Sequence, residues 1–347
     1  MIVTRNVTKY FGKVLALKDV SFEIGKGEIV GFLGKNGAGK TTLMRILTSY
    51  LPPSSGTVSI LNQDIARDPV AIRRHIGYLP ETPPLYPNMT VRDYLKFAAQ
   101  LKDVPIKQLR SRIDKVLDDC RLLYVQDKLI AHLSKGYQQR IGIAQAIIHE
   151  PQLLILDEPT SGLDPAQIQQ VRKLIKDIEH QRTVLLSTHI LSEIEQIAKR
   201  VLIINSGEII RDESLESLLK TEGHSRRMMI RFKGDRRSVE TVLIHRKNWK
   251  WCDGEFPEGV HALELEGDEQ AGRPIDPSIT AVGLTQDSAQ RVAQKGTIPL
   301  SEVGLHCNDL IQLLIGAHVQ ILEIKELKPS LEEVFLKLNP PLEIQRR

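Results

Sequence analysis

The sequence predicts an α/β fold, in which buried strands alternate with helices, followed by a smaller α+β domain. Glu28–Leu33 is predicted to be a buried strand and leads directly into a glycine-rich segment. The apolar runs Leu153–Leu156 and Thr183–Ser187 are typical of parallel strands that are buried on both faces. The hydrophobic patterning weakens after about residue 223, and charged residues crowd Arg226–Arg237. This change of texture indicates a second domain.

The first third of the chain contains the next predicted elements. Short apolar runs separated by turns predict strands and hairpins over residues 1–30. Prolines predict a loop from Pro80 to Pro87. Thr90 is the predicted N-cap of a helix, and a second helix carries apolar residues from Leu109 to Leu117 at helical spacing. These two helices form an insertion between more strongly patterned segments.

Alternation of strands and helices resumes in the middle of the chain. Ser134 begins a predicted helix that ends before Pro151, and Asp164–Pro165 is a helix start with a capping side chain. Val201–Ile210 is predicted to be a hairpin, and Ser214–Lys220 a helix that closes the first domain. The second domain has six weaker candidates. They are strands at Met228–Phe232, Trp249–Cys252 and Val319–Ile324, and helices at Val239–Arg246, Asn308–Gly316 and 331–338.

The composition is that of a folded protein of about two domains. Of the 347 residues, 41% are hydrophobic and 26% are charged, which excludes disorder as the default state. A net charge of +4 and only 5% aromatic residues argue against nucleic acid as a partner. The three cysteines form no C-x-x-C pair, which indicates a reducing compartment and no structural metal. No apolar run approaches the ~20 residues that cross a bilayer, so we expect another chain to hold the protein at any membrane.

The most specific motif is Gly34–Thr42, which matches the phosphate-binding pattern G-x-x-x-x-G-K-[ST] between a strand and a helix at Leu43–Leu47. Its glycines allow backbone N–H groups to surround an anion, and the helix N-terminus adds partial positive charge. Lys40 is expected to reach the β- and γ-phosphates, and the Thr41 hydroxyl to bind Mg²⁺. A glycine-rich turn that binds nothing is disfavoured by the length and context of the motif. The predicted nucleotide contacts here are Gly34, Asn36, Gly37, Gly39, Lys40, Thr41 and Thr42.

Two acidic residues follow the apolar strand at Leu153–Leu156. Asp157 is expected to bind Mg²⁺ directly or through water, because Mg²⁺ prefers hard oxygen ligands. Glu158 is then placed to polarise an attacking water as a general base. The alternative is an acidic pair that ends a strand at the surface, and the phosphate-binding loop disfavours it.

The ordered motifs resemble the ATP-binding cassette of ABC transporters over about residues 2–220. They are the phosphate-binding loop, Leu133–Arg140, Leu153–Glu158, Ser161–Asp164 and His189, and the run from Leu133 to Asp164 is especially specific. The resemblance implies a P-loop NTPase fold, with a mixed-sheet core plus a helical subdomain and a small C-terminal α+β domain. The implied domains are a cassette at 1–222, its helical subdomain at about 88–135, and an accessory domain at 223–347.

The resemblance also implies a shared catalytic site. Two cassettes pair head to tail, and each ATP lies between Lys40 of one chain and Ser134 with Gly136 of the other. Asp164 is similar to the aspartate that couples the two sites. His189 is similar to the switch histidine that contacts the γ-phosphate and the attacking water.

Three positions add detail to this resemblance. Phe11 is similar to the aromatic residue that stacks on adenine, with Tyr10 as the alternative. The signature peptide reads Ser-Lys-Gly-Tyr where Ser-Gly-Gly-Gln is commonest, but Ser134 and Gly136 are kept. Glu81 occupies the position of the Q-loop glutamine, where a carboxylate can still bind Mg²⁺ but adds negative charge beside the triphosphate.

Two further segments resemble one branch of the family. Glu81–Val91 and Pro329–Phe335 are similar to segments of the ATPases of ABC-2 type exporters, including gliding-motility and multidrug-type systems. The resemblance implies an ATPase that uses ATP and Mg²⁺ on the cytoplasmic face of the cell (inner) membrane as a peripheral subunit. Its implied partners are an integral membrane permease and a second cassette, as a homodimer. Regulation and dimerisation both stay open as roles for the C-terminal domain.

Other classes are disfavoured. Soluble regulatory or translation-associated ABC proteins, which have no permease, usually carry two cassettes in one chain. In chromosome-maintenance ATPases a long coiled coil separates the motifs, whereas about 90 residues lie between Thr42 and Leu133. A protein that binds ATP without hydrolysing it would not require Glu158 and His189. A GTPase is disfavoured because the chain has no N-K-x-D motif.

Overall fold

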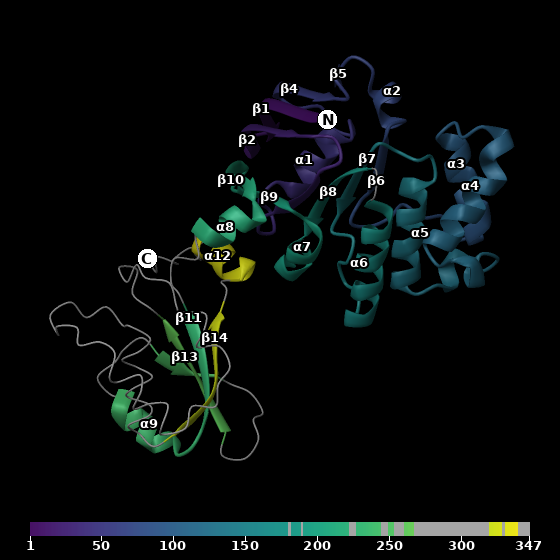
Figure 1. The fold of residues 1–347 in the computed structure, drawn as a ribbon. Coiled ribbons are helices and arrows are strands. Elements are labelled where there is room, and N and C mark those ends of the chain that lie inside the picture. Colours follow the sequence, from purple (N-terminus) through teal and green to yellow (C-terminus); the bar gives the residue numbers. More distant parts are fainter. Residues whose placement is uncertain are drawn as a thin grey trace. The chain divides into compact units, whose positions relative to one another are not determined.

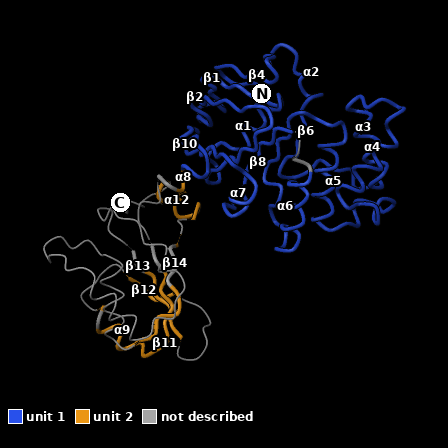
Figure 2. Tube along the Cα trace, in the orientation of Figure 1, with its two compact units in different colours: residues 1–217, 341–347 blue, residues 218–340 orange. Residues whose placement is uncertain are grey.

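The chain forms two compact units, residues 1–217 and residues 218–340 (Figure 2). The structure is a computed structural model. The residues that it describes are 1–179, 182–188, 190–221, 227–243, 249–252, 260–266, 319–327 and 330–338. In this part of the chain, no helix has both the length and the apolar character that crossing a membrane requires.

The first unit is built around a six-stranded sheet with the order β10-β9-β3-β8-β7-β6 (Figure 1). The five strands from β9 to β6 are parallel to their neighbours, and β10 pairs antiparallel at one edge. The sheet is therefore mixed, as predicted. The bounds of its strands are Ile29–Leu33 (β3), Ile76–Leu79 (β6), Leu153–Asp157 (β7), Thr183–Thr188 (β8), Arg200–Asn205 (β9) and Glu208–Ser214 (β10).

A second, antiparallel sheet with the order β2-β1-β4-β5 shares the hydrophobic core of this unit. Its strands are Ile2–Phe11 (β1), Val14–Ile24 (β2), Ser55–Ile60 (β4) and Gln63–Asp64 (β5). The core joins Leu17 of β2, Phe32 of β3 and Met44 of α1 (Lys40–Leu47), all of them fully buried. This packing fixes the start of α1 against both sheets.

Among the described residues, seven further α-helices begin in the first unit, and those at Pro69–Arg73 and Leu191–Ile197 were not predicted. Their bounds are Pro69–Arg73 (α2), Val91–Leu101 (α3), Ile106–Asp119 (α4), Lys135–Ile147 (α5), Pro165–Glu179 (α6), Leu191–Ile197 (α7) and Leu215–Thr221 (α8). Helices α3, α4 and α5 pack together at one end of the unit (Figure 1). The Thr90 hydroxyl accepts a hydrogen bond from the backbone N–H of Asp93, which confirms the predicted cap of α3.

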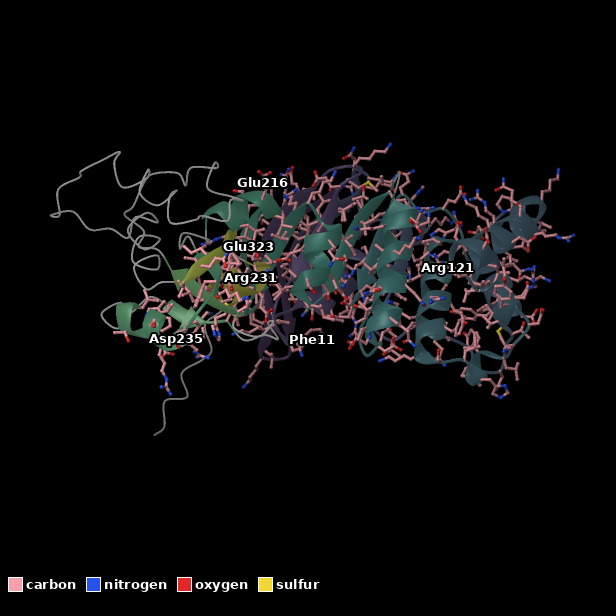
Figure 3. The ribbon with its side chains drawn as sticks, turned by 60° about the horizontal axis from the view of Figure 1, so that its bottom comes forward. Phe11, Arg121, Glu216, Arg231, Asp235 and Glu323 are labelled. Carbon is pink, nitrogen blue, oxygen red and sulfur yellow. The ribbon has the colours of Figure 1, made fainter. Side chains whose placement is uncertain are left out.

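The second unit contains a four-stranded antiparallel sheet with the order β12-β13-β11-β14. Its elements are Arg227–Lys233 (β11), Arg236–Leu243 (α9), Trp249–Trp251 (β12), Val260–Glu266 (β13), Gln320–Leu327 (β14) and Leu331–Leu338 (α12). Its core packs Phe232 of β11 against Val239 of α9 and Leu263 of β13. Across the neighbouring strands β11 and β14, Arg231 and Glu323 form an ion pair of 2.9 Å (Figure 3).

Several predictions in this second unit are confirmed, and others need correction. The strands that contain Met228–Phe232 and Val319–Ile324 are present, as is the helix at 331–338. The helix predicted from Val239 begins earlier, at Arg236, because Asp235 accepts a hydrogen bond from the backbone N–H of Ser238. Strand β13 was not predicted from the sequence. The helix predicted at Asn308–Gly316 lies outside the described residues.

A buried histidine makes the stability of the first unit sensitive to acid. His149 Nε2 lies 3.1 Å from the carbonyl oxygen of Ile76, and burial with the nearby Lys102 charge lowers the pKa of His149 to about 4. The unfolded chain binds a proton near pH 6.5, so between pH 6.5 and 4 the unfolded state holds more protons. The free energy of unfolding should therefore fall by up to about 3 kcal/mol as the pH drops through this window.

Urea unfolding at pH 7 and pH 4.5 tests this expectation with His149→Gln. Glutamine keeps an N–H donor for the Ile76 carbonyl but does not titrate, so this variant should lose less stability between the two pH values than the unaltered chain. The control is His132→Gln, at an exposed position. Equal acid losses in the unaltered chain and His149→Gln would contradict the assignment.

Candidate functional site

The predicted site residues gather at one edge of the six-stranded sheet. Strands β3, β8 and β7 are adjacent and parallel, with Leu33 paired to Thr188 and Asp157 paired to Ser187. The carboxyl ends of the three strands therefore meet. The glycine-rich loop follows β3, and Glu158 follows β7. This edge is where ligands bind in open α/β sheets.

The glycine-rich loop has the backbone that its sequence predicts. Gly37 and Gly39 have φ values of 80° and 109°, which disfavour residues with a side chain. A Cβ atom on Gly39 would also lie 2.8 Å from the carbonyl oxygen of Ala16. Gly39 is the N-cap of α1 and provides no side-chain hydrogen bond there. The first N–H groups of α1 have no intrahelical acceptor and are free to bind an anion.

Lys40 and Glu158 face each other beside this loop. Lys40 is 6% exposed, and its Nζ donates hydrogen bonds to the carbonyl oxygens of Gly34 (2.7 Å) and Lys35 (3.4 Å). Its Nζ lies 3.5 Å from Oε1 of Glu158, which is 7% exposed. A buried cation and a buried carboxylate are thus held against each other where β3 and β7 end.

The backbone of Glu158 is held in an unusual conformation. Its φ of 50° lies in the left-handed region, which costs free energy for a residue with a side chain. Its N–H group donates to the carbonyl oxygen of Ser187 (3.0 Å) and approaches Oγ of the same residue (3.1 Å). Hydrogen bonds to β8 therefore fix the backbone of Glu158 where the chain continues beyond β7.

Asp157 is fully buried and presents an oxygen atom with no partner. Ser187 Oγ donates a 2.5 Å hydrogen bond to Oδ1, whereas Oδ2 is buried without a hydrogen-bond partner among the described residues. Burial raises the pKa of Asp157, the nearby hydroxyl groups of Ser187 and Thr41 partly offset that shift, and the negative charge of Glu81 adds to it. The structure therefore brings Asp157, Thr41 and Glu81 to the same region.

This donor set fits Mg²⁺ better than a metal that the protein encloses. The described residues hold no group of three or more His, Cys, Asp and Glu side chains that could bind a metal. A hydroxyl, one buried carboxylate and an exposed Glu81 instead provide hard oxygen atoms on one side only. Mg²⁺ is commonly bound in this way, by one or two carboxylates together with substrate phosphates and water.

The residues predicted for the second half of a shared pocket also lie together. Ser134 is exposed and is the N-cap of α5 without a side-chain hydrogen bond. Gly136 is buried, and the side chain of Gln167 packs against it. Asp164 caps α6, since its Oδ1 accepts a 2.8 Å hydrogen bond from the N–H group of Gln167. Gln167 thus connects the starts of α5 and α6.

Other predicted site residues are more exposed. Asn36 is exposed in the loop, and Thr42 is half-buried in α1. Phe11, labelled in Figure 3, ends β1 at 47% exposure, with Lys9 Nζ 5.4 Å from its ring centroid. Tyr10 is 49% exposed, so both aromatic rings are accessible. His189 lies outside the described residues.

Two polar residues that support this site, Ser187 and Glu193, were not predicted from the sequence. Ser187 bonds to Asp157 and Glu158, and Glu193 accepts hydrogen bonds from Thr160 and Thr188. Glu193 shares one face of α7 with the buried Ile197, four residues later. The sequence signal that could have identified Glu193 was therefore a charged residue at a core-facing helix position.

Comparisons with known proteins agree with this geometry. Residues 17–161 match the family described as ABC transporter. The bacitracin transport ATP-binding protein BcrA of Bacillus licheniformis is 39% identical over 222 residues, which are 63% of this chain and 72% of BcrA. The ABC transporter ATP-binding protein NatA of Bacillus subtilis is 37% identical over 212 residues, covering 60% of this chain and 86% of NatA.

A solved structure of an ATP-binding cassette is also similar to this chain. The ATP-binding cassette MJ0796, described as a dimer in a post-hydrolysis state with ADP and Pi, superposes with a TM-score of 0.58 at 28% identity. The match covers 62% of this chain and 99% of that cassette. The fold and the loop define a nucleotide-binding ATPase of the P-loop class. The chain belongs to the ATP-binding proteins of ABC transporters and is an ATP-hydrolysing cassette.

Proposed function

We propose that this chain is the ATP-hydrolysing subunit of an ABC-2 type export transporter, which powers a separate membrane permease from the cytoplasmic face of the cell membrane. The observation that carries the catalytic part is the buried pair of Lys40 and Glu158, 3.5 Å apart beside the phosphate-binding loop. The similarity to a bacitracin transport protein supports the transport role.

The proposed catalytic roles follow from this pair. Lys40 binds the β- and γ-phosphates, and in doing so it replaces its contact with Glu158 by contacts with ATP. The Glu158 carboxylate is then released to orient the attacking water as a general base. The proximity of the two side chains supports this exchange, because one cation cannot pair fully with both anions. For His189 we propose the role that the resemblance implies, which is contact with the γ-phosphate and the attacking water.

The proposed Mg²⁺ ligands are Thr41 and Asp157, with Glu81 as an additional oxygen donor. Oδ2 of Asp157, which is buried without a partner, supports this assignment. Held by these residues, Mg²⁺ would supply positive charge to offset the negative charge that develops on the phosphate oxygens. The hydrogen bond from Ser187 occupies Oδ1 of Asp157, so Oδ2 is the carboxylate oxygen that this serine leaves available to a metal.

We further propose that two copies of the chain share each ATP molecule. One copy contributes the loop from Gly34 to Thr42 with Phe11 or Tyr10 at the adenine, and the other contributes Ser134, Gly136 and Asp164. The dimeric form of the similar cassette MJ0796 supports this arrangement. The proposed domains are the cassette at 1–222, with its helical subdomain at about 88–135, and an accessory domain at 223–347.

The permease is proposed to dock on the loop at residues 81–89 and the helices that follow it. Tyr86 in this loop is 52% exposed and packs edge to face on Phe97 and Tyr94 of α3, with ring centroids 5.5 and 6.0 Å away. The hydroxyl of Tyr94 donates to the carbonyl oxygen of Pro84 at 3.2 Å. These contacts attach the loop to the helical subdomain, so a force on one would move the other.

A photo-crosslinking amino acid in place of Tyr86 tests the docking in membranes from cells that express the full transporter. We expect a light-dependent adduct with an integral membrane protein. The control position is Tyr50, which is 72% exposed and follows α1 on the same unit. Labelling from position 50 but not from 86 would refute the docking loop. No membrane adduct from either position would favour a soluble regulatory ATPase.

A further inference from the structure

A buried carboxylate behind the site has no role in the mechanism above. Glu193 lies on α7 and is 1% exposed. Its Oε2 accepts hydrogen bonds from the hydroxyl groups of Thr160 (2.8 Å) and Thr188 (3.2 Å), whereas Oε1 is buried without a hydrogen-bond partner among the described residues. Burying a carboxylate is costly, so an apolar residue would fill this space at lower cost.

The two threonines connect Glu193 to the catalytic segment. Thr160 lies two residues after Glu158, in a turn where the N–H group of Ser161 donates to the Glu158 carbonyl oxygen at 3.1 Å. Thr188 is the last residue of β8. The segment that carries Glu158 is thus fastened to β8 twice, through Ser187 before the turn and through Glu193 after it.

We propose that Glu193 is a positioning residue for ATP hydrolysis, because its carboxylate holds Thr160 against the end of β8 and so fixes the loop from which Glu158 acts. The inference rests on the general-base role proposed above for Glu158. The φ of 50° at Glu158 is a conformation that persists only when surrounding contacts enforce it. An ionised oxygen can accept two strong hydrogen bonds at once, as Oε2 does here.

The charges around Glu193 are consistent with this role. Burial raises the pKa of Glu193, and the hydrogen bonds from Thr160 and Thr188 oppose that shift together with the positive charge of Arg172. Arg172 belongs to α6 and donates to Oε1 of Gln196 at 2.7 Å. The threonine hydroxyl groups therefore stabilise the ionised form of Glu193 that accepts their hydrogen bonds.

Steady-state ATP hydrolysis by the full chain tests the inference with two substitutions. Glu193→Leu removes the acceptor and should lower kcat at least about 10-fold while KM for ATP changes less than about threefold, because small misplacements of a catalytic group act on the chemical step. Glu193→Gln keeps a carbonyl acceptor and should retain more of the rate. Glu195→Gln changes an exposed carboxylate on the same helix and should leave kcat unchanged.

A second arm keeps the test informative if Glu193→Leu does not fold. Thr160→Val preserves shape but removes the hydroxyl donor, and it should also lower kcat. If Glu193 acts through Thr160, the effects of Thr160→Val and Glu193→Gln on kcat should not add in the double variant. Additive effects would overturn this route.

Folded variants with unchanged kcat, or a loss confined to the unfolding midpoint, would overturn the inference while the proposed function stands. An unaltered chain without hydrolysis would overturn both.

Discussion

Glu158→Gln should abolish turnover while preserving ATP binding. Glutamine has the shape of glutamate but cannot accept a proton from water at neutral pH, so kcat should fall at least ~10²-fold. The loop that binds the phosphates is unchanged, and Lys40 loses its competing contact at 3.5 Å. ATP should therefore bind at least as tightly, and two copies that cannot hydrolyse it should accumulate as a closed dimer.

Phosphate release and size-exclusion chromatography in ATP and Mg²⁺ check both parts of this expectation. Glu23→Gln is the matched control, because Glu23 is exposed on β2 of the same unit. The control should hydrolyse ATP like the unaltered chain and show no extra dimer. Unchanged turnover in Glu158→Gln would remove the general-base role of Glu158. Lost turnover without a dimer would instead contradict the shared pocket.

Local sequence patterns predict much of the first unit, because helix caps, helical periodicity and continuous apolar runs determine its elements. The Thr90 cap and the apolar face of α3 obey helical periodicity, and the residues Leu153–Leu156 of β7 are all buried, as a continuous apolar run predicts. The second unit is harder. Its strand β13, at Val260–Glu266, carries two glutamates near its C-terminal end, and its pairing with β11 and β12 depends on contacts distant in sequence.

The candidate site shows the same division. The motif residues Lys40, Asp157 and Glu158 come together as the order of strands requires. The supporting residues Ser187 and Glu193 were not predicted, because a serine in a strand is ordinary in sequence and the core-facing position of Glu193 does not identify its partners. Only the paired register of Asp157 with Ser187, and the turn that brings Thr160 to α7, reveal what these two residues contact.

Lys40→Ala should weaken ATP binding, whereas Glu158→Gln should preserve it. A hydrogen bond to a charged group contributes about 1.5–3 kcal/mol, so ATP affinity should fall roughly 10- to 100-fold. The loss has two sources, because the variant removes the cation that binds the phosphates and also removes the Lys40 contact that offsets the buried Glu158 carboxylate beside the triphosphate. Fluorescent ATP binding measures the total, and Lys26→Ala, at an exposed lysine, should bind ATP normally.

The double variant Lys40→Ala with Glu158→Gln divides that loss. If repulsion between the Glu158 carboxylate and the triphosphate contributes, the double variant should bind ATP more tightly than Lys40→Ala alone, although neither hydrolyses it. If both variants bind ATP equally weakly, the whole loss of ATP affinity is caused by the missing lysine. Normal ATP affinity in Lys40→Ala would refute the proposed site, because the phosphates would then not bind beside Lys40 and Glu158.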